Sequence, residues 1–254
     1  MQKSPVVIPA EIVKNCRGVL LDLGSTLLEY ENTPYSELIP ISFKSAYDYL
    51  IANSPKTPDY DAFYAAFRTI MHSFQQRAAN EFKEYCFNDI TEPLLVQFRI
   101  PPTPELLHGF FEHYYLKITQ QVTPYPDSKS TLSRLKAAGL SICIVSNSCF
   151  PGKVHRAELA RFGLFKYIDN FVFSSDLGIR KPHRDVYFKA LRKLGLDADE
   201  VVFAGDRQRE DVLGPQMAGI AAALIRRPHR DYEPGLTNCP EIDGVSGLIG
   251  LLDL

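Results

Sequence analysis

The side chain that the sequence places best for chemistry is the carboxylate of Asp22, at the end of a hydrophobic run. The apolar residues 19–21 lead into this aspartate, and a turn of Gly24, Ser25 and Thr26 follows it. A buried strand that ends in this way leaves a carboxylate where the backbone opens toward a ligand. Such a carboxylate can act as a nucleophile that forms a covalent intermediate.

Three later motifs fit the same chemistry in chain order. They are Ser146-Asn147 after an apolar run, Lys181-Pro182 before a helical pattern, and Gly205-Asp206 with Asp211 five residues beyond the second aspartate. A carboxylate attacks phosphorus only when its charge and that of the phosphate are offset, which requires a metal ion and a cation. Asp206 and Asp211 offer the hard oxygen ligands that suit Mg²⁺. Lys181 can supply the cation, and Ser146 and Asn147 can hydrogen-bond a phosphoryl oxygen.

The motifs must be positioned by a fold that brings distant segments together. Short apolar runs in the sequence predict the strands of that fold. They predict strands at 18–23, 140–145, 171–173, 201–204 and 221–225, separated by helical patterns. This alternation predicts an α/β fold, a Rossmann-like doubly wound, mostly parallel sheet with helices on both faces. Ligands in such folds lie beyond the carboxyl ends of the strands, and every motif above falls at such an end.

Between the first motif and the second, the pattern changes to long amphipathic stretches rich in Phe and Tyr. Helices are predicted at 35–51, 60–84, 89–98 and 103–119, joined by turns that contain proline. We therefore expect a core of 1–32 and 121–254 and a helical insert of 33–120 that packs over Asp22 as a lid. The aromatic residues of the insert recur at helical spacing, which indicates core packing: Phe63, Tyr64, Phe67 and Phe74.

Composition limits the functions open to the chain. Its 254 residues suffice for one large domain or for a core with an insert. A net charge of -2 provides no electrostatic attraction to nucleic acid or to a membrane surface. Five cysteines without a CxxC pair indicate a reduced, cytoplasmic setting, and no run of about 18 apolar residues predicts a membrane span. We expect a monomer or homodimer that binds a small molecule.

As a set, the motifs resemble those of the haloacid dehalogenase-like (HAD) hydrolase superfamily, whose first motif is an apolar strand followed by Asp-x-Asp-Gly-Thr. Residues 22–26 read Asp-Leu-Gly-Ser-Thr, and the insert occupies the position of the superfamily's helical C1 cap. The resemblance implies a Mg²⁺-dependent phosphatase of a small phosphorylated metabolite that works through an aspartyl-phosphate at Asp22. It also implies that Asp22, Asp206 and the backbone carbonyl of Gly24 contact the metal, with Asp211 helping.

The chain departs from the superfamily pattern at Gly24, where phosphatases usually carry the aspartate that protonates the leaving oxygen and later activates water. Such a group contributes about 10²- to 10⁴-fold to the rate. A working phosphatase remains compatible with the glycine if water, the substrate, Ser25 or a residue of the insert carries the proton. The candidates in the insert are Tyr30, His72 and Glu84.

The glycine at position 24 is also compatible with functions that are not those of a phosphatase. A phosphonatase would need a Schiff-base lysine from the insert, for which Lys44, Lys83 and Lys117 are weak candidates. A dehalogenase would not need the Gly205-Asp206 motif that is present here. A phospho-ligand binding protein without turnover would keep the pocket and need no acid. A dinucleotide-binding enzyme is rejected because no Gly-x-Gly-x-x-Gly follows the first strand.

A basic run, Arg226-Arg227-Pro228-His229-Arg230, follows the last of the predicted strands. Its position at the active edge of the sheet allows a role in holding an anionic substrate. We expect it instead to be a solvated loop, which is the commoner fate of a charged run.

Overall fold

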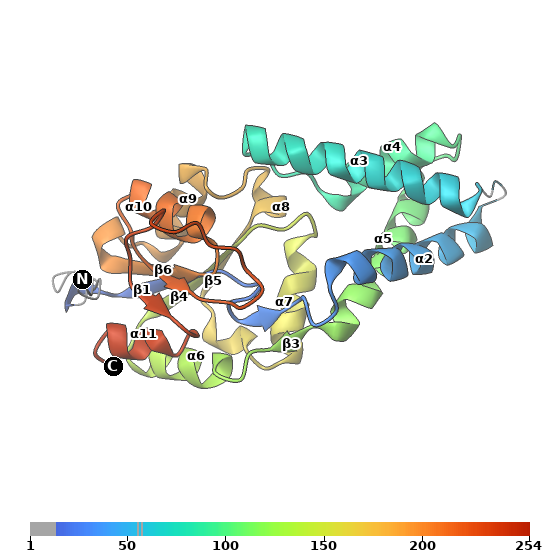
Figure 1. Cartoon of the computed structure of the whole chain (residues 1–254). Helices are drawn as coiled ribbons and strands as arrows, with labels where there is room; N and C mark the ends of the chain where they lie inside the picture. Colours follow the sequence, from blue (N-terminus) through green and yellow to red (C-terminus); the bar gives the residue numbers. More distant parts are fainter. Residues whose placement is uncertain (1–13, 55, 57) are drawn as a thin grey trace. The chain divides into compact units, whose positions relative to one another are not determined.

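The computed structural model describes residues 14–54, 56 and 58–254, which form two compact units (Figure 1). The helical unit is Tyr30–Thr123. The other unit, the core, consists of Pro124–Leu254 together with residues 14–29. The insert predicted at 33–120 lies within the helical unit.

The core contains a six-stranded sheet in which every pair of neighbouring strands is parallel. Its order is β5-β4-β1-β6-β7-β8. The strands are β1 (Gly18–Leu21), β4 (Ser141–Ser146), β5 (Asn170–Phe173), β6 (Val201–Gly205), β7 (Ala221–Ile225) and β8 (Glu241–Ile242). The predicted α/β fold with a mostly parallel sheet is confirmed. Only β8 was not predicted, since two residues are too short to show a pattern.

Helices cover both faces of the sheet, with α6 and α11 on one side and α9 and α10 on the other (Figure 1). The core helices are α6 (Ser128–Ala137), α7 (Gly152–Arg161), α8 (Ser174–Leu177), α9 (Arg184–Leu194), α10 (Gly214–Met217) and α11 (Gly247–Leu251). Burial on both faces explains why the strands read as continuous apolar runs. The helix α9 shows the matching pattern, because Val186, Tyr187, Ala190 and Leu191 form its buried stripe.

The direction in which the chain adds strands to the sheet reverses at β1, which lies between β4 and β6. From β1 the chain passes to β4 and β5 on one side and then to β6, β7 and β8 on the other. In open parallel sheets, ligands bind beyond the carboxyl ends of the strands at such a switch point. The topology therefore marks the ends of β1, β4 and β6 as the place for a site.

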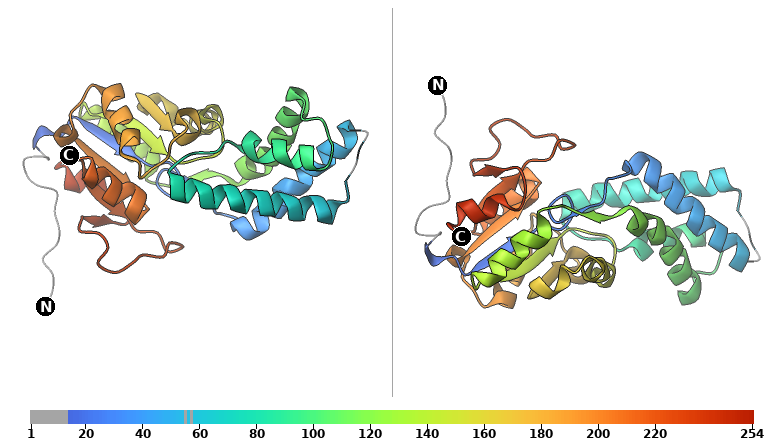
Figure 2. Two further views of the ribbon diagram at one scale, coloured as in Figure 1. Left: turned by 90° about the horizontal axis from the view of Figure 1, so that it is seen from above. Right: turned by 90° about the horizontal axis from the view of Figure 1, so that it is seen from below.

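The helical unit consists of α2 (Tyr35–Asn53), α3 (Tyr60–Glu81), α4 (Phe87–Gln97) and α5 (Pro104–Gln121). The side chains of Asp59 and Thr103 cap α3 and α5 by accepting hydrogen bonds from backbone N–H groups of the first turn. The helices α2 and α5 lie side by side (Figure 2). Of the four aromatic residues predicted to pack in a core, Phe63 and Phe67 are fully buried, and Tyr64 and Phe74 are half-buried. The predicted helix 60–84 ends early because Phe82 adopts a left-handed conformation with φ of 51°.

Two short strands connect the units. They are β2 (Leu28–Glu29) and β3 (Thr123–Pro124), which pair in a two-stranded sheet. Beside them the side-chain amide of Asn32 donates hydrogen bonds to the carbonyl of Gln121 at 2.7 Å and to the hydroxyl of Thr123 at 2.9 Å. The outgoing and returning segments of the chain therefore run next to each other. Among the residues described, no helix combines the length and the apolar character needed to cross a membrane.

Candidate active site

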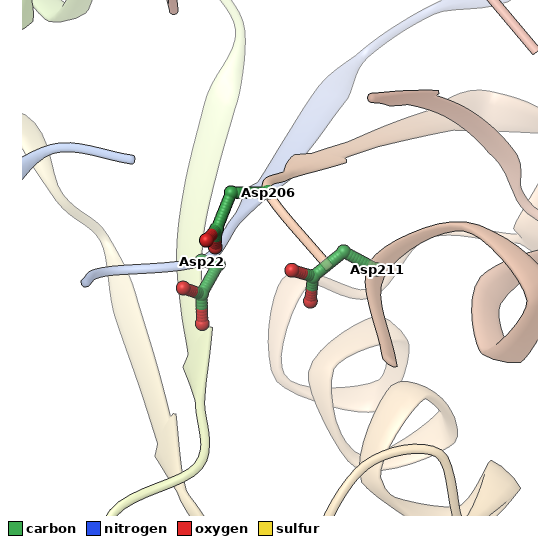
Figure 3. A group of neighbouring side chains, drawn as sticks. All are labelled: Asp22, Asp206 and Asp211. Atoms are coloured by element: carbon green, nitrogen blue, oxygen red, sulfur yellow. The ribbon is translucent and has the colours of Figure 1, made fainter. Parts of the chain in front are cut away.

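Three carboxylates meet at the switch point of the sheet (Figure 3). Asp22 follows β1 directly, and its backbone N–H donates a hydrogen bond to the carbonyl of Ala204 at 3.0 Å. Asp206 follows β6 in the same way, and Asp211 comes from the next turn of the chain. All three are buried, and one oxygen from each lies within 4.8 Å of the other two. The structure thus brings together the three aspartates that the sequence motifs singled out.

Asp211 is oriented by an irregular helical segment, Gln208–Leu213, whose hydrogen bonds follow the π-helical pattern. Its Oδ2 accepts a hydrogen bond from the backbone N–H of Arg207 at 2.9 Å. A Cβ atom at Gly205 would lie 2.5 Å from the carboxyl carbon of Asp211. The glycine of the Gly205-Asp206 pair is therefore needed for the close approach of this carboxylate to the strand end.

Lys181 is the cation at the centre of the cluster. Its side chain is 2% exposed, and its Nζ donates to Asp22 Oδ1 at 2.8 Å and to Asp211 Oδ1 at 2.6 Å. Burial would lower the pKa of this amine, but the carboxylates of Asp211 and Asp22 outweigh burial and raise it. The lysine is therefore positively charged throughout the physiological pH range.

The crowding of the carboxylates changes their own protonation. Burial raises the pKa of Asp211 to about 7; Lys181 opposes this rise, and the charges of Asp22 and Asp206 add to it. Burial and the charge of Asp22 also raise the pKa of Asp206, and Arg230 opposes that rise. Both shifts therefore arise first from burial and then from the repulsion between neighbouring carboxylates.

The residues fit a divalent cation with oxygen ligands. Among the described residues, Asp206 Oδ1 is a buried oxygen without a hydrogen-bond partner. A buried, unsatisfied carboxylate oxygen is costly unless a cation satisfies it. Mg²⁺ takes carboxylate and carbonyl oxygens in preference to nitrogen or sulfur. The donor atoms of Asp22, Asp206 and Asp211 therefore suit Mg²⁺, and no histidine or cysteine belongs to the group.

Ser146 and Asn147 lie at the end of β4, as the second motif predicts, and the side-chain amide of Asn147 is bonded to the backbone of Lys181. Its Nδ2 donates to the backbone carbonyl of Lys181 at 3.0 Å, and its Oδ1 accepts from the backbone N–H of Lys181 at 2.8 Å. Asn147 therefore positions the lysine. Ser146 is 7% exposed and is the residue of this motif whose side chain stands at the strand end.

The loop after Asn147 is connected to α7 by a chain of hydrogen bonds that are partly or fully buried. The Ser148 hydroxyl lies 2.7 Å from His155 Nε2, and His155 Nδ1 lies 3.2 Å from the carboxylate of Glu158. The backbone N–H of Phe150 donates to the same hydroxyl at 3.0 Å. His155 is thus a locally bonded histidine, and its partners fix the loop that carries Asn147.

The basic run at 226–230 is a solvated loop only in part, because Arg226, Pro228 and His229 are exposed, whereas Arg227 is buried and Arg230 is half-buried. Arg227 is 9% exposed, with Nε 2.5 Å from the carbonyl of Ser25 and its guanidinium 3.7 Å from the ring centre of Tyr125. Arg230 Nε lies 2.5 Å from Asp206 Oδ2. Arg227 and Arg230 therefore contact the first and fourth motifs beyond the strand ends, and these contacts explain why the two side chains are less exposed than Arg226.

The turn after Asp22 has an unusual backbone at Ser25, not at Gly24. Ser25 has φ of 54°, a left-handed conformation that glycine normally adopts. Gly24 is not among the described glycines with positive φ. Its backbone is therefore open to residues with side chains, and the absence of an aspartate at this position has no cause in the backbone angle.

The proton donors suggested in the insert, Tyr30, His72 and Glu84, all belong to the helical unit. His72 Nε2 lies 2.8 Å from the side-chain amide of Gln76 within the same helix, and Glu84 is buried. Of the lysines suggested for Schiff-base chemistry, Lys44 pairs with Asp48, and Lys83 Nζ lies 5.1 Å from the ring centre of Tyr85. The roles suggested for these residues stay predictions.

Fold and site together define a hydrolase of the HAD type, and a comparison with known families agrees. Residues 48–225 match the family model for haloacid dehalogenase-like hydrolases. The chain belongs to this family.

Two relatives are similar to this chain in sequence. Glyceraldehyde 3-phosphate phosphatase of Methanopyrus kandleri is 30% identical over 142 residues, which cover 56% of this chain and 60% of that protein. Its counterpart from Methanocaldococcus jannaschii is 25% identical over 85% of this chain and 88% of that protein. Among solved structures, a HAD phosphatase from Thermococcus onnurineus shares the fold, with a TM-score of 0.65 and 22% identity over 93% of this chain and 97% of that one.

Proposed function

We propose that the protein is a Mg²⁺-dependent phosphatase of small phosphorylated metabolites that works through an aspartyl-phosphate at Asp22. The observation that carries this proposal is the cluster of Asp22, Asp206 and Asp211 around the buried Lys181 at the switch point of the sheet. The relatives named as glyceraldehyde 3-phosphate phosphatases support a small phosphate ester as substrate.

In the first step, a carboxylate oxygen of Asp22 attacks phosphorus, and the ester P–O bond breaks with its electron pair on the leaving oxygen. Lys181 holds the carboxylate in place and offsets its negative charge as the phosphate approaches. Ser146 offers a hydroxyl to a phosphoryl oxygen at the strand end. Asn147 contributes indirectly, because it fixes the backbone of Lys181.

In the second step, water attacks the phosphorus of the aspartyl-phosphate, which releases inorganic phosphate and regenerates the carboxylate of Asp22. Asp22, Asp206 and the carbonyl of Gly24 would hold Mg²⁺, with Asp211 beside them. The bound ion would offset charge on the phosphoryl oxygens and orient the group toward Asp22. Lys181 and Asp211 are held by hydrogen bonds to protein atoms, so they are already oriented before substrate arrives.

A phosphate-release screen tests the proposal. Purified protein is offered sugar phosphates, nucleotides, phosphorylated carboxylic acids and acyl phosphates, with Mg²⁺ and with chelator, and inorganic phosphate is measured. We expect release from at least one class that requires Mg²⁺. Release that persists in chelator contradicts the metal requirement. If no compound is hydrolysed while phosphate analogues still bind, the protein is a phospho-ligand binder and the proposed function is wrong.

A further inference from the structure

The loop that follows β7 brings three basic side chains onto the turn that follows Asp22. Arg227 is the anchor, because its guanidinium donates to the carbonyls of Ser25, Thr26 and Asp243 at 2.5, 3.4 and 3.1 Å. Two more basic residues reach the hydroxyl of Ser25, with Arg230 Nη2 at 2.9 Å and His229 Nε2 at 3.2 Å. The anchored loop thus places cations beside the position where the acid is missing.

The turn itself is modified at two successive positions. Where the superfamily motif has Asp-Gly, this chain has Gly24-Ser25, so the carboxylate is lost and a hydroxyl is gained one residue later. Ser25 keeps the left-handed conformation that suits glycine, in which a residue with a side chain is strained. Such strain persists only where surrounding contacts enforce it, and here the contacts come from Arg227, His229 and Arg230.

Arg230 is the member of the loop that also reaches the carboxylate cluster. Its Nε donates to Asp206 Oδ2 at 2.5 Å while Nη2 donates to Ser25. The other carboxylate oxygen, Asp206 Oδ1, is the buried oxygen without a partner among the described residues. One guanidinium therefore bridges a proposed metal ligand and the turn that has lost its acid, and it leaves the second oxygen of Asp206 for the ion.

We propose that Arg230 replaces the missing acid at position 24 by offsetting, with its fixed positive charge, the negative charge that develops on the leaving oxygen. The inference rests on the proposed phosphatase function. Arginine does not donate its proton at physiological pH, since the pKa of its guanidinium lies far above that range. The leaving oxygen therefore departs with the bonding pair beside the guanidinium and takes its proton from water, which becomes hydroxide.

Charge stabilisation of this kind has a kinetic signature that distinguishes it from a structural role. A group that offsets charge on the leaving oxygen matters most when the leaving group is a poor one, such as an alkoxide. It matters least when the leaving group stabilises its own charge, as nitrophenolate does. A residue that only holds Asp206 in place would affect every substrate equally.

The first test compares kcat/KM of wild type, Arg230→Gln and Arg226→Gln over a series of alkyl and aryl phosphates of rising leaving-group pKa. Arg226 is a matched control in the same loop, since it is exposed and pairs with Glu241 at 3.7 Å. For Arg230→Gln we expect a loss of about 10²-fold on alkyl phosphates, the size seen when one charge-stabilising donor is removed, and less than about 10-fold on nitrophenyl phosphate. Arg226→Gln should leave the series unchanged.

Arg230→Lys keeps the charge but loses the forked geometry, so it should retain part of the activity on alkyl phosphates and provides a second variant if Arg230→Gln does not fold. Equal losses on all esters would overturn the inference. Titration of Mg²⁺ by calorimetry would show why the losses are equal. Replacing a residue that only orients Asp206 would weaken the binding of Mg²⁺ without any dependence on the leaving group. If wild type hydrolyses no ester, the proposed function fails instead.

A double-mutant cycle adds an independent test. In the Gly24→Asp background a carboxyl group is available to protonate the leaving oxygen, so the further change Arg230→Gln should cost less on alkyl phosphates than it does in wild type. A non-additivity of at least about 10-fold in kcat/KM supports a shared role at the leaving oxygen. Additive losses would show that the two residues act independently, and the inference would be wrong.

Discussion

Ion pairs between carboxylates and cations hold the charged residues of this site in place. Three carboxylates share two ion-pair partners, Lys181 and Arg230, so carboxylates outnumber the cations bonded to them where a phosphate must bind. The unpartnered oxygen of Asp206 lies in this cluster. Replacing one charged residue therefore changes more than one interaction in the cluster, even where the new side chain has the same shape as the old one.

Asp22→Asn should reduce phosphate release by about 10³-fold or more while the fold is retained, because the amide has the shape of the carboxylate but is not a nucleophile. Turnover with the best substrate and the circular dichroism spectrum measure the two expectations. Residual activity above about a tenth of wild type would show that another residue is the nucleophile.

Gly24→Asp should increase turnover of alkyl phosphates by up to about 10²-fold, since it restores a proton donor whose usual contribution is 10²- to 10⁴-fold. The described backbone allows it, because the left-handed residue of the turn is Ser25 and not Gly24. The measurement is kcat/KM on alkyl and aryl phosphates, and the increase should be smallest for aryl esters. No gain on any ester would mean that a donor is already present.

Asp211 should make the stability of the metal-free protein depend on pH. Its pKa is about 7 in the folded protein and about 3.9 in the unfolded chain. Between these values the folded state binds more protons, so the free energy of unfolding falls as pH rises through the window. Asp211→Asn removes this titration. The melting temperature of the variant relative to wild type should therefore rise from pH 5 to pH 7.5 in chelator, and a constant difference would contradict the assignment.

At the scale of secondary structure, the element that positions the second motif is the segment from β4 to α7. Its loop is held to the helix through Ser148, His155 and Glu158, with His155 and Glu158 buried. The loop carries Asn147, which in turn holds the backbone of Lys181. The position of the central lysine therefore depends on a histidine outside the carboxylate cluster.

His155→Ala should lower the free energy of unfolding by about 1–3 kcal/mol, because one buried and one partly buried hydrogen bond are lost. It should also reduce kcat, because the lysine is no longer held in position. Urea denaturation and steady-state kinetics measure both effects. The control is His108→Ala, whose side chain is 57% exposed and pairs with Glu112. Equal effects of the two substitutions would show that the bonds of His155 contribute nothing.

These elements also show which parts of the molecule a sequence reveals. The strand ends at Asp22, Ser146 and Asp206 could be predicted because apolar runs and the residues that end them are local properties of the chain. The contact of Arg230 with Ser25 could not, since it joins residues 205 positions apart through a loop with no periodic pattern. Asn147 could be identified from the sequence, but its bonds to the backbone of Lys181 could not. Backbone N–H and carbonyl groups occur throughout a chain, so a sequence does not show which of them a side chain will contact.

For the whole molecule, metal binding should be linked to stability. An ion that binds only the folded state at 100 times its Kd stabilises it by about 2.7 kcal/mol, and each kcal/mol shifts the melting temperature of a protein of this size by roughly 2–4 °C. Mg²⁺ should therefore raise the melting temperature by about 5–10 °C. Scanning calorimetry with and without the ion measures this, and Asp206→Asn should show a smaller shift. An equal shift in the variant would place the ion elsewhere.

The pairing of β2 with β3 has a consequence for how such a molecule can change over time. Because Leu28–Glu29 and Thr123–Pro124 are neighbours, a short connection between them would suffice for the core. The number of residues in that connection matters little, since each doubling of a flexible loop costs about 0.6 kcal/mol in loop-closure entropy. Recombination can therefore replace the segment between β2 and β3 as one unit. Asp22 at the end of β1 keeps the same sequence neighbours after such an exchange.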